Sequence, residues 1–204
     1  MAWAYLGLGS NLGDRDGHLG FALARLSQVG TVVARAPVIE TDPVDCPGGG
    51  MFLNTCVCLE TALGPPELLS AATQIERQRG RSRTTRNEPR VLDIDILLYD
   101  DLVLREQALQ IPHPRMHERA FVLEPLAEIA PYVVHPSFNV TVRSLLVRLT
   151  SAASEQEAYK GRFAKRCRTA GSLPLRAVRA PAPAIARSSA HTEIPTPPTC
   201  AGTC

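Results

Sequence analysis

VLDIDILLYD, residues 91–100, is typical of a buried β-strand, because branched and apolar side chains favour a pleated backbone. Two carboxylates, Asp93 and Asp95, interrupt the apolar run. Side chains two positions apart in a strand point to the same face, with Cα atoms roughly 6–7 Å apart. The two acids would repel each other and lose hydration, so a positive group should lie between them. Magnesium prefers hard oxygen ligands shared with phosphates and is the natural candidate; the alternative is a solvated face of an edge strand.

The composition fits one ordinary domain followed by a tail. Of the 204 residues, 45% are hydrophobic, which is enough for a core. The net charge of +2 is too small to favour nucleic acid or an anionic membrane as a partner. The sequence contains no run of transmembrane length and no basic leader, so we expect a cytoplasmic protein. Cys56 and Cys58 should pack in the core, and without a CxxC pair we expect neither a zinc site nor disulfides.

Apolar periodicity predicts an alternation of strands and helices. Strands are expected at 2–9, 31–39, 51–61 and 91–100, and helices at 14–28, 65–79, 121–129 and 142–149. The first six elements follow the split βαβ order, which predicts an α+β fold: a ferredoxin-like βαββαβ antiparallel sheet with two helices on one face. Gly7 and Gly9 lack the spacing of a dinucleotide-binding fingerprint, and we expect them to allow a tight turn or close backbone packing.

The chain changes character near residue 150. No aromatic residue follows Phe163, and Ala, Pro, Ser and Arg dominate. Such a composition buries too little apolar surface to offset the entropy lost on ordering. We therefore expect the functional domain to span residues 1–150, a helical extension to span 151–164, and a disordered tail without an assigned role to span 165–204.

Basic residues gather on both sides of the carboxylate strand. GRSRTTRNEPR, residues 80–90, carries four arginines and leads directly into the strand. IPHPRMHERAF, residues 111–121, combines two histidines with two arginines. Arginine binds phosphate in a bidentate way, so these segments beside paired aspartates predict a site for phosphate and metal rather than a solvated basic loop.

Five stretches occur in order: LGLGSNLGDR; ETDPV with FLNTCVCLET; IERQRGRSR; EPRVLDIDILLYD; and IPHPRMHERAFVLEPLAEIAP. Together they span nearly all of residues 2–131, and they resemble the 6-hydroxymethyl-7,8-dihydropterin pyrophosphokinase family of folate biosynthesis. The resemblance implies an ATP-dependent diphosphokinase of the transferase class. Such an enzyme transfers pyrophosphate from ATP to the hydroxymethyl group of the pterin and releases AMP. The resemblance further implies ATP as co-substrate and two Mg²⁺ ions as cofactors.

The same resemblance implies roles for individual residues. Asp93 and Asp95 match the magnesium ligands, and with Arg81 and Arg90 they form the expected catalytic set. The expected ATP-binding residues are Glu76, Arg81, Arg83, Arg90, His113 and Arg119. The expected pterin-binding residues are Thr41, Asp42, Val44, Phe52, Asn54 and Phe121, with Phe52 and Phe121 on opposite faces of the ring. From spacing alone, plain core packing is the preferred interpretation of both phenylalanines, whereas an internal amide such as Asn54 supplies a donor and an acceptor together.

Two departures from the family pattern lie in loops. Asn87 and Glu88 stand where the family usually has Trp-Gly, in a loop that looks one residue shorter, and Asp42 stands where a proline is common. A glutamate near triphosphate is unfavourable unless it points outward, so a homologue with weakened turnover is one alternative.

Two other functions remain compatible with the predicted fold. A two-metal nucleotidyltransferase or nuclease would use the same aspartates but needs an extended basic groove, which the small net charge disfavours. An RNA-binding module would need aromatic side chains on the central strands, and Val91–Asp100 offers only Tyr99. We expect a monomer that acts on ATP and the pterin, without nucleic acid or membrane partners. Association with other enzymes of the folate pathway is left open.

Overall fold

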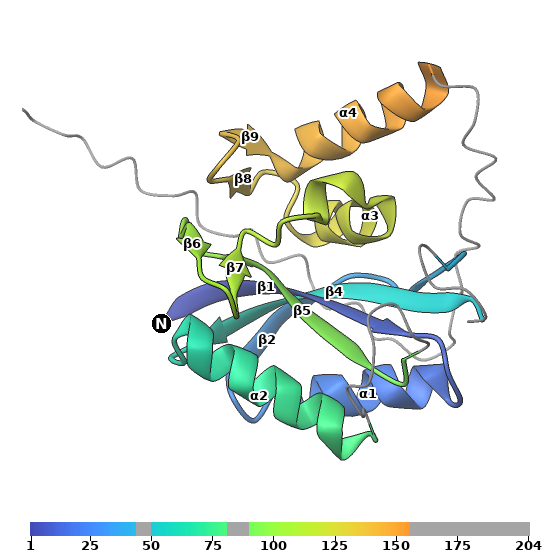
Figure 1. Cartoon of the computed structure of the whole chain (residues 1–204), viewed down its shortest axis with the longest axis vertical. Helices are drawn as coiled ribbons and strands as arrows, with labels where there is room; N and C mark the ends of the chain where they lie inside the picture. The colour runs from blue at the N-terminus through green and yellow to red at the C-terminus, as the bar shows by residue number, and fades with distance from the viewer. Residues whose placement is uncertain (44–49, 81–89, 156–204) are drawn as a thin grey trace, which may run out of the picture.

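The computed structural model describes residues 1–43, 50–80 and 90–155 (Figure 1). The elements in chain order are β1 (Ala2–Ser10), α1 (Arg15–Leu26), β2 (Thr31–Arg35), β3 (Ile39–Thr41), β4 (Phe52–Thr61), α2 (Pro65–Gln78), β5 (Asp93–Tyr99), β6 (Leu104–Arg105), β7 (Gln110–Ile111), η1 (Met116–Glu118), α3 (Ala120–Ile129), β8 (Val134–His135), β9 (Val140–Thr141) and α4 (Val142–Glu155). No helix in this part of the chain is long and apolar enough to cross a membrane. The expected tail, 165–204, and all but the first residues of the expected extension, 151–164, lie outside the described residues.

The main sheet has the strand order β2-β4-β1-β5, and β3 pairs with β4 next to β2. Every neighbouring pair in it is antiparallel. β1 and β4 form the centre and pair along their whole length, from Ala2 opposite Thr61 to Ser10 opposite Leu53. α1 connects β1 to β2, and α2 connects β4 to β5, so the predicted ferredoxin-like α+β fold is confirmed.

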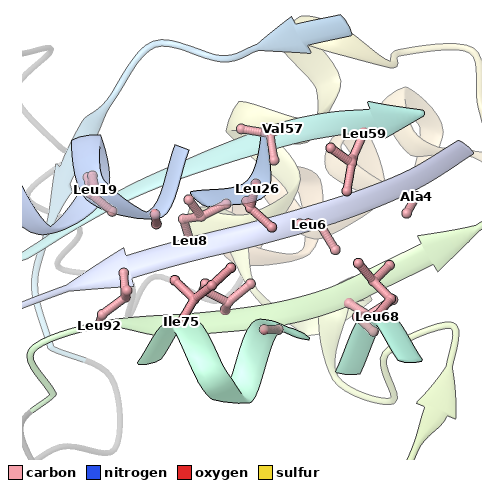
Figure 2. Packing of buried hydrophobic residues seen from close by; sticks show 14 of the residues in the cluster. Ala4, Leu6, Leu8, Leu19, Leu26, Val57, Leu59, Leu68, Ile75 and Leu92 are labelled. Carbon is pink, nitrogen blue, oxygen red and sulfur yellow. The ribbon is translucent and has the colours of Figure 1, made fainter. Parts of the chain in front are cut away.

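Helices α1 and α2 cover one face of the sheet, as predicted, and the larger hydrophobic cluster lies between them and the strands (Figure 1). Figure 2 shows Leu19 and Leu26 of α1, and Leu68 and Ile75 of α2, directed at alternate residues of the strands. The strand residues of this cluster include Ala4, Leu6, Leu8, Leu53, Val57, Leu59, Ile94 and Ile96. In the strands, these buried residues recur at every second position, and in the helices they recur at steps of three, four and seven. Both spacings match the apolar periodicity seen in the sequence.

Helices α3 and α4 lie on the opposite face of the sheet (Figure 1). There Tyr5, Cys58 and Leu98 join Leu123 and Leu126 of α3 in a second buried cluster. Cys56 and Cys58 are free thiols inside it, which confirms their predicted core position. The second cluster reaches only part of this face, and the remainder carries the cavity described below.

The structure corrects two predicted element boundaries. The single strand expected at 31–39 is divided into β2 and β3, because Pro37 lies between them and has no N–H to donate to the ladder. The helix expected at 142–149 continues to Glu155. Two short hairpins, β6–β7 and β8–β9, were not predicted, since two-residue strands carry no detectable period.

Candidate functional site

A cavity of about 480 Å³ opens on the α3 face of the sheet, where β1 leads towards α1. It gathers residues that are far apart in the sequence. Among the predicted site residues, its lining includes Thr41, Asp42, Phe52, Asn54, Arg90, Asp93, Asp95, His113, Arg119 and Phe121. Val44, Arg81 and Arg83 lie outside the described residues, as do Asn87 and Glu88. Glu76 is described but does not line the cavity.

Two glycines of β1 form the floor of this cavity. A Cβ atom at Gly9 would lie 3.0 Å from Oδ1 of Asn54, and a Cβ atom at Gly7 would lie 3.4 Å from Cδ2 of Leu97. Both glycines line the cavity. The expected close packing is therefore confirmed: removing two side chains from the middle of the sheet leaves space for neighbouring side chains and for a ligand. The turn into α1 uses a different glycine, Gly13, whose φ is +64°.

One end of the cavity combines an aromatic side chain with a fixed amide. Phe52 and Asn54 are two residues apart on β4 and share the cavity face. Asn54 is only 7% exposed, and its Nδ2 donates a hydrogen bond to Oγ1 of Thr41 over 2.8 Å. Thr41 thereby fixes which way the amide of Asn54 faces. This end can offer a flat apolar surface together with in-plane polar groups.

Phe121 brings a second aromatic ring to the lining of the cavity. It lies in the first turn of α3, and the guanidinium carbon of Arg119 is 5.6 Å from the centroid of its ring. This cation–π contact places an aromatic ring and a cation next to each other in one lining. Both Phe121 and Phe52 are half-buried, so neither has the full burial that plain core packing would give.

The other end of the cavity carries the two carboxylates. Asp93 and Asp95 stand opposite Gly9 and Gly7 of β1, on the same face of β5. Burial raises the pKa of Asp95 above the usual range for a carboxyl group, and the charge of Asp93 raises it further. Arg119 and Arg90 act in the opposite direction. A cation bound between the two acids would relieve their mutual repulsion.

Arg90 already pairs with one of these acids. Its Nη1 lies 2.6 Å from Oδ2 of Asp93. Burial opposes the charge on Arg90, but Asp93 and Asp95 outweigh it and raise the pKa of the guanidinium above its ordinary value. The sequence suggested phosphate rather than protein as the partner of Arg90. In the structure, the guanidinium pairs with Asp93.

Glu76 supports the carboxylate strand from outside the cavity. The side chain is 3% exposed, and its Oε1 accepts a hydrogen bond from the backbone N–H of Ile94 over 2.8 Å. Ile94 is the residue between Asp93 and Asp95, on a strand at the edge of the sheet. A buried carboxylate therefore satisfies an N–H that the ladder leaves unpaired.

A bulge in β5 connects the carboxylate end to the histidine segment. Leu98 pairs with Tyr5 and Ile96 with Leu6, so Leu97 is an extra residue in the ladder. Its carbonyl accepts a hydrogen bond from the backbone N–H of His113 over 2.9 Å. This bond attaches the segment with His113, Arg115 and Arg119 to the site.

His113 is neutral at neutral pH. Burial, helped by the charge of Arg119, lowers its pKa from the ordinary value of 6.5 to about 4. Its Nδ1 accepts a hydrogen bond from the backbone N–H of Arg115 over 3.2 Å, so the proton of the neutral ring is on Nε2. The imidazole can therefore donate one hydrogen bond without adding a charge.

The donor set fits a hard divalent cation bound together with a phosphate. Within the described residues, no three His, Cys, Asp or Glu side chains form a metal-holding group. Two carboxylates alone leave the remaining coordination positions to water and ligand oxygens. That is the usual arrangement for magnesium bound with a nucleotide.

Several lining residues were not predicted as site residues. Arg115 was noted only as part of the basic segment, and its place between His113 and Arg119 is the signal that could have included it. Cys56 and Val122 also line the cavity, but nothing in the sequence distinguishes them from core residues.

A family model matches residues 5–131, and its description is 7,8-dihydro-6-hydroxymethylpterin-pyrophosphokinase (HPPK). A 2-amino-4-hydroxy-6-hydroxymethyldihydropteridine pyrophosphokinase of Bacillus subtilis (strain 168) is 47% identical over 159 residues, which cover 77% of this chain and 88% of the relative. A protein of the same name from Methylorubrum extorquens is 42% identical over 158 residues, which cover 76% of this chain and 99% of the relative.

Solved structures agree on the fold. The crystal structure of Plasmodium falciparum HPPK-DHPS with pteroate matches with a TM-score of 0.67 at 16% identity, over 81% of this chain and 47% of that chain. At this identity the match supports the fold alone. The chain therefore spans less than half the length of that solved protein.

Proposed function

The chain belongs to the 7,8-dihydro-6-hydroxymethylpterin-pyrophosphokinase family, and we propose that its cavity holds ATP and the pterin end to end. The chain is a transferase of folate biosynthesis. It transfers pyrophosphate from ATP to 6-hydroxymethyl-7,8-dihydropterin. The proposal concerns which residues carry each part of this reaction.

One observation carries the assignment: the cavity lining has two chemically different ends on either side of β1, and it also includes the contact between Arg119 and Phe121. The end with Phe52 and Asn54 suits a flat heterocycle with polar edges. The end with Asp93, Asp95 and Arg90 suits a metal-bound triphosphate. An acceptor hydroxyl at the first end would then lie beside the phosphates at the second.

The pterin end includes every predicted pterin-binding residue that the structure describes. Phe52 and Phe121 would contact the two faces of the ring. Asn54, held by Thr41, would bond its edge with a donor and an acceptor of one amide. Asp42 lines the same end and is exposed, while Val44 would add backbone groups outside the described residues.

The phosphate end would hold ATP in line with the acceptor. The hydroxymethyl oxygen attacks the β-phosphorus, and the bond from that phosphorus to the oxygen of the α-phosphate breaks, which releases AMP. Arg90 and Arg119 would stabilise negative charge on the phosphates, and His113 would donate from Nε2. Arg81 and Arg83 would add further charge from outside the described residues.

Asp93 and Asp95 would hold magnesium. We propose two ions there, which when bound would neutralise negative charge on the phosphates during transfer. Asp93 would then share its carboxylate between the metal and Arg90, or exchange one for the other. Glu76 would act indirectly, because it holds the backbone of Ile94 between the two ligands.

The reaction products test the proposal. The full chain is incubated with ATP, Mg²⁺ and 6-hydroxymethyl-7,8-dihydropterin, and the nucleotides and pterins are separated by chromatography. We expect AMP and pterin pyrophosphate in equal amounts, with no AMP when the pterin is omitted. ADP would indicate an ordinary kinase, and release of pyrophosphate would indicate nucleotidyl transfer. No turnover that depends on the pterin would favour the weakened homologue, with Asn87 and Glu88 as the first residues to restore to Trp-Gly.

Four further expectations from the sequence belong to this proposal. A domain limit near residue 150 predicts that a chain ending at residue 164 keeps its activity and its midpoint of thermal unfolding. A monomer predicts one species of about 22 kDa in light scattering. A cytoplasmic location and two magnesium ions per nucleotide are tested by fractionation and by equilibrium dialysis with a non-hydrolysable ATP analogue.

A further inference from the structure

Asn11 lies directly after β1 and is buried, with 5% of its surface exposed. It exchanges two hydrogen bonds with the backbone of a single distant residue. Its N–H donates to the carbonyl of Arg90 over 3.1 Å, and its side-chain Oδ1 accepts from the N–H of Arg90 over 2.6 Å. Val91, which follows Arg90, is held in a similar way, because Oγ of Ser10 donates a hydrogen bond to its carbonyl over 2.6 Å.

These three bonds begin where the regular ladder between β1 and β5 stops. The last paired residues are Gly9 and Asp93. Ser10 and Asn11 extend the connection to Val91 and Arg90 with two side-chain bonds and one backbone bond. The backbone of Arg90 is therefore fixed relative to the cavity floor by a group that is not itself in the cavity lining.

The two ends of Arg90 are held by different partners. Its guanidinium pairs with Asp93, whereas its backbone is bonded to Asn11. If Asp93 becomes a magnesium ligand, the ion pair is weakened or exchanged when the nucleotide binds. The hydrogen bonds from Asn11 do not involve any atom that would bind metal or nucleotide. They can therefore keep the backbone of Arg90 in place while the nucleotide binds.

The choice of an amide is also informative. Nδ2 of Asn11 is buried and has no hydrogen-bond partner within the part of the chain that the structure describes. An unpaired buried donor reduces stability. An aspartate would accept the same bond from Arg90 without that donor, but it would add a further negative charge to a region that already holds Asp93, Asp95 and Glu76. Asparagine at this position is therefore better explained by the need to limit negative charge at the site than by a gain in stability.

We propose that Asn11 is a positioning residue, which fixes the backbone of Arg90 so that its guanidinium stays over the phosphate site while Asp93 binds metal. This inference rests on the proposed function. It gives the turn after β1 a role in turnover beyond connecting β1 to α1. Its effect should pass through one side chain, that of Arg90.

A double-mutant cycle tests this route. Asn11→Ala should lower kcat about 10- to 100-fold, as expected for a misplaced catalytic group, with the KM for the pterin nearly unchanged. In an Arg90→Ala background, Asn11→Ala should have no further effect on kcat, because the guanidinium is already absent. The backbone bonds remain in Arg90→Ala, so the loss of thermal stability caused by Asn11→Ala should be the same in both backgrounds.

Binding of ATP provides a readout that does not depend on turnover. Calorimetry with Mg²⁺ and ATP, without pterin, should show weaker binding for Asn11→Ala with Arg90 present, and no additional weakening with Arg90→Ala. This measurement remains decisive even if the chain makes no pterin pyrophosphate, so failure of the proposed function and failure of this inference can be distinguished.

Thr61→Val is the matched control. Thr61 is fully buried at the other end of the sheet, and its Oγ1 forms two hydrogen bonds with backbone groups, of Val29 and Leu63. Loss of the Thr61 hydroxyl should reduce the stability of the fold and leave kcat and ATP affinity unchanged. The inference is wrong if Asn11→Ala has equal effects on kcat in both backgrounds, or if it affects only stability, as the Thr61 variant does.

Discussion

The two faces of the central sheet have different functions, although β1, β4 and β5 contribute residues to both. On the face towards α1 and α2, Leu6 and Leu8 of β1 are buried in a continuous apolar cluster. On the other face, the intervening Gly7 and Gly9 expose the backbone to a polar cavity. Neighbouring residues in the sequence thus serve stability and function separately, because a strand turns alternate side chains to opposite faces.

The functional face is itself divided. Tyr5, Cys58 and Leu98 lie in a closed apolar half against α3 and α4, whereas Asp93 and Asp95 lie in the open half. The change from the open half to the apolar half occurs at the bulge in β5. Before the bulge, Asp93 and Asp95 face the cavity, whereas Leu97 and Leu98 belong to the apolar cluster. Substitutions on the two faces should therefore separate stability from catalysis, and the following predictions test that separation.

Asp95→Asn should produce the largest effect. Loss of a magnesium ligand should lower the single-turnover rate at least about 1,000-fold, roughly 4 kcal/mol of transition-state stabilisation. The thermal midpoint without magnesium should stay the same or rise, because a charge that burial and Asp93 both disfavour is removed. Asp101→Asn, on the exposed turn after β5, is the matched control and should change neither quantity. Unfolding of the Asp95 variant would assign this residue to the core.

Leu6→Ala should produce the reverse result. Leu6 is fully buried between the sheet and the helices, so its truncation should lower the free energy of unfolding by about 3 kcal/mol. Denaturant titration measures that loss. At a temperature where the variant is folded, the KM values for ATP and the pterin and the kcat should match those of the unchanged chain. A selective loss of kcat would show that the two faces are coupled.

Phe121→Ala should weaken binding of the pterin about tenfold, since an aromatic contact contributes roughly 1.5 kcal/mol. Affinity for ATP should change much less, which calorimetry with each ligand alone can show. Phe138→Ala is a control, because Phe138 is an exposed aromatic residue outside the cavity. Equal weakening of both ligands would mean that Phe121 supports the fold rather than the ring.

The sequence was sufficient to predict the apolar face of the sheet and the shared face of the two carboxylates, because both depend on local periodicity. The pairing of Asp93 and Asp95 follows from their spacing alone. The parts that depend on register or on long-range contacts were not predictable. The extra residue at Leu97 is defined only by its pairing with β1, and Asn11 meets Arg90 across 79 positions of sequence. The ion pair between Arg90 and Asp93 also required the three-dimensional arrangement.

Gly9→Ala tests the floor of the cavity. Its Cβ would lie 3.0 Å from Oδ1 of Asn54 and should displace that amide. We expect the KM for the pterin to rise several-fold, about 1 kcal/mol, with little change in the KM for ATP. Gly20→Ala in α1 is the matched control, because no atom lies within 4 Å of the added Cβ, and it should be neutral or stabilising. An unchanged KM for the pterin would remove Asn54 from the pterin site.

The smallest effect concerns pH and a residue of β8, outside the cavity lining. His135 is 3% exposed and stacks on Phe138, with ring centroids 4.3 Å apart. Burial, followed by the charge of the nearby His117, lowers its pKa. The stabilisation from a neutral His135 is therefore complete above the unfolded pKa near 6.5, and it is lost as the pH falls towards the lower pKa of the folded state.

We therefore expect His135→Phe to flatten the fall in the free energy of unfolding between about pH 7 and pH 5, since an apolar ring cannot be protonated. Denaturant titrations of both chains at several pH values measure the difference. Nδ1 of His135 has no hydrogen-bond partner within the described ranges, so the substitution removes no side-chain bond from that atom. His113, whose pKa is also lowered, to about 4, lies in the open half, and His113→Gln should change ATP affinity as well as this slope. If His135→Phe also altered ATP affinity, the β8–β9 hairpin would be coupled to the cavity.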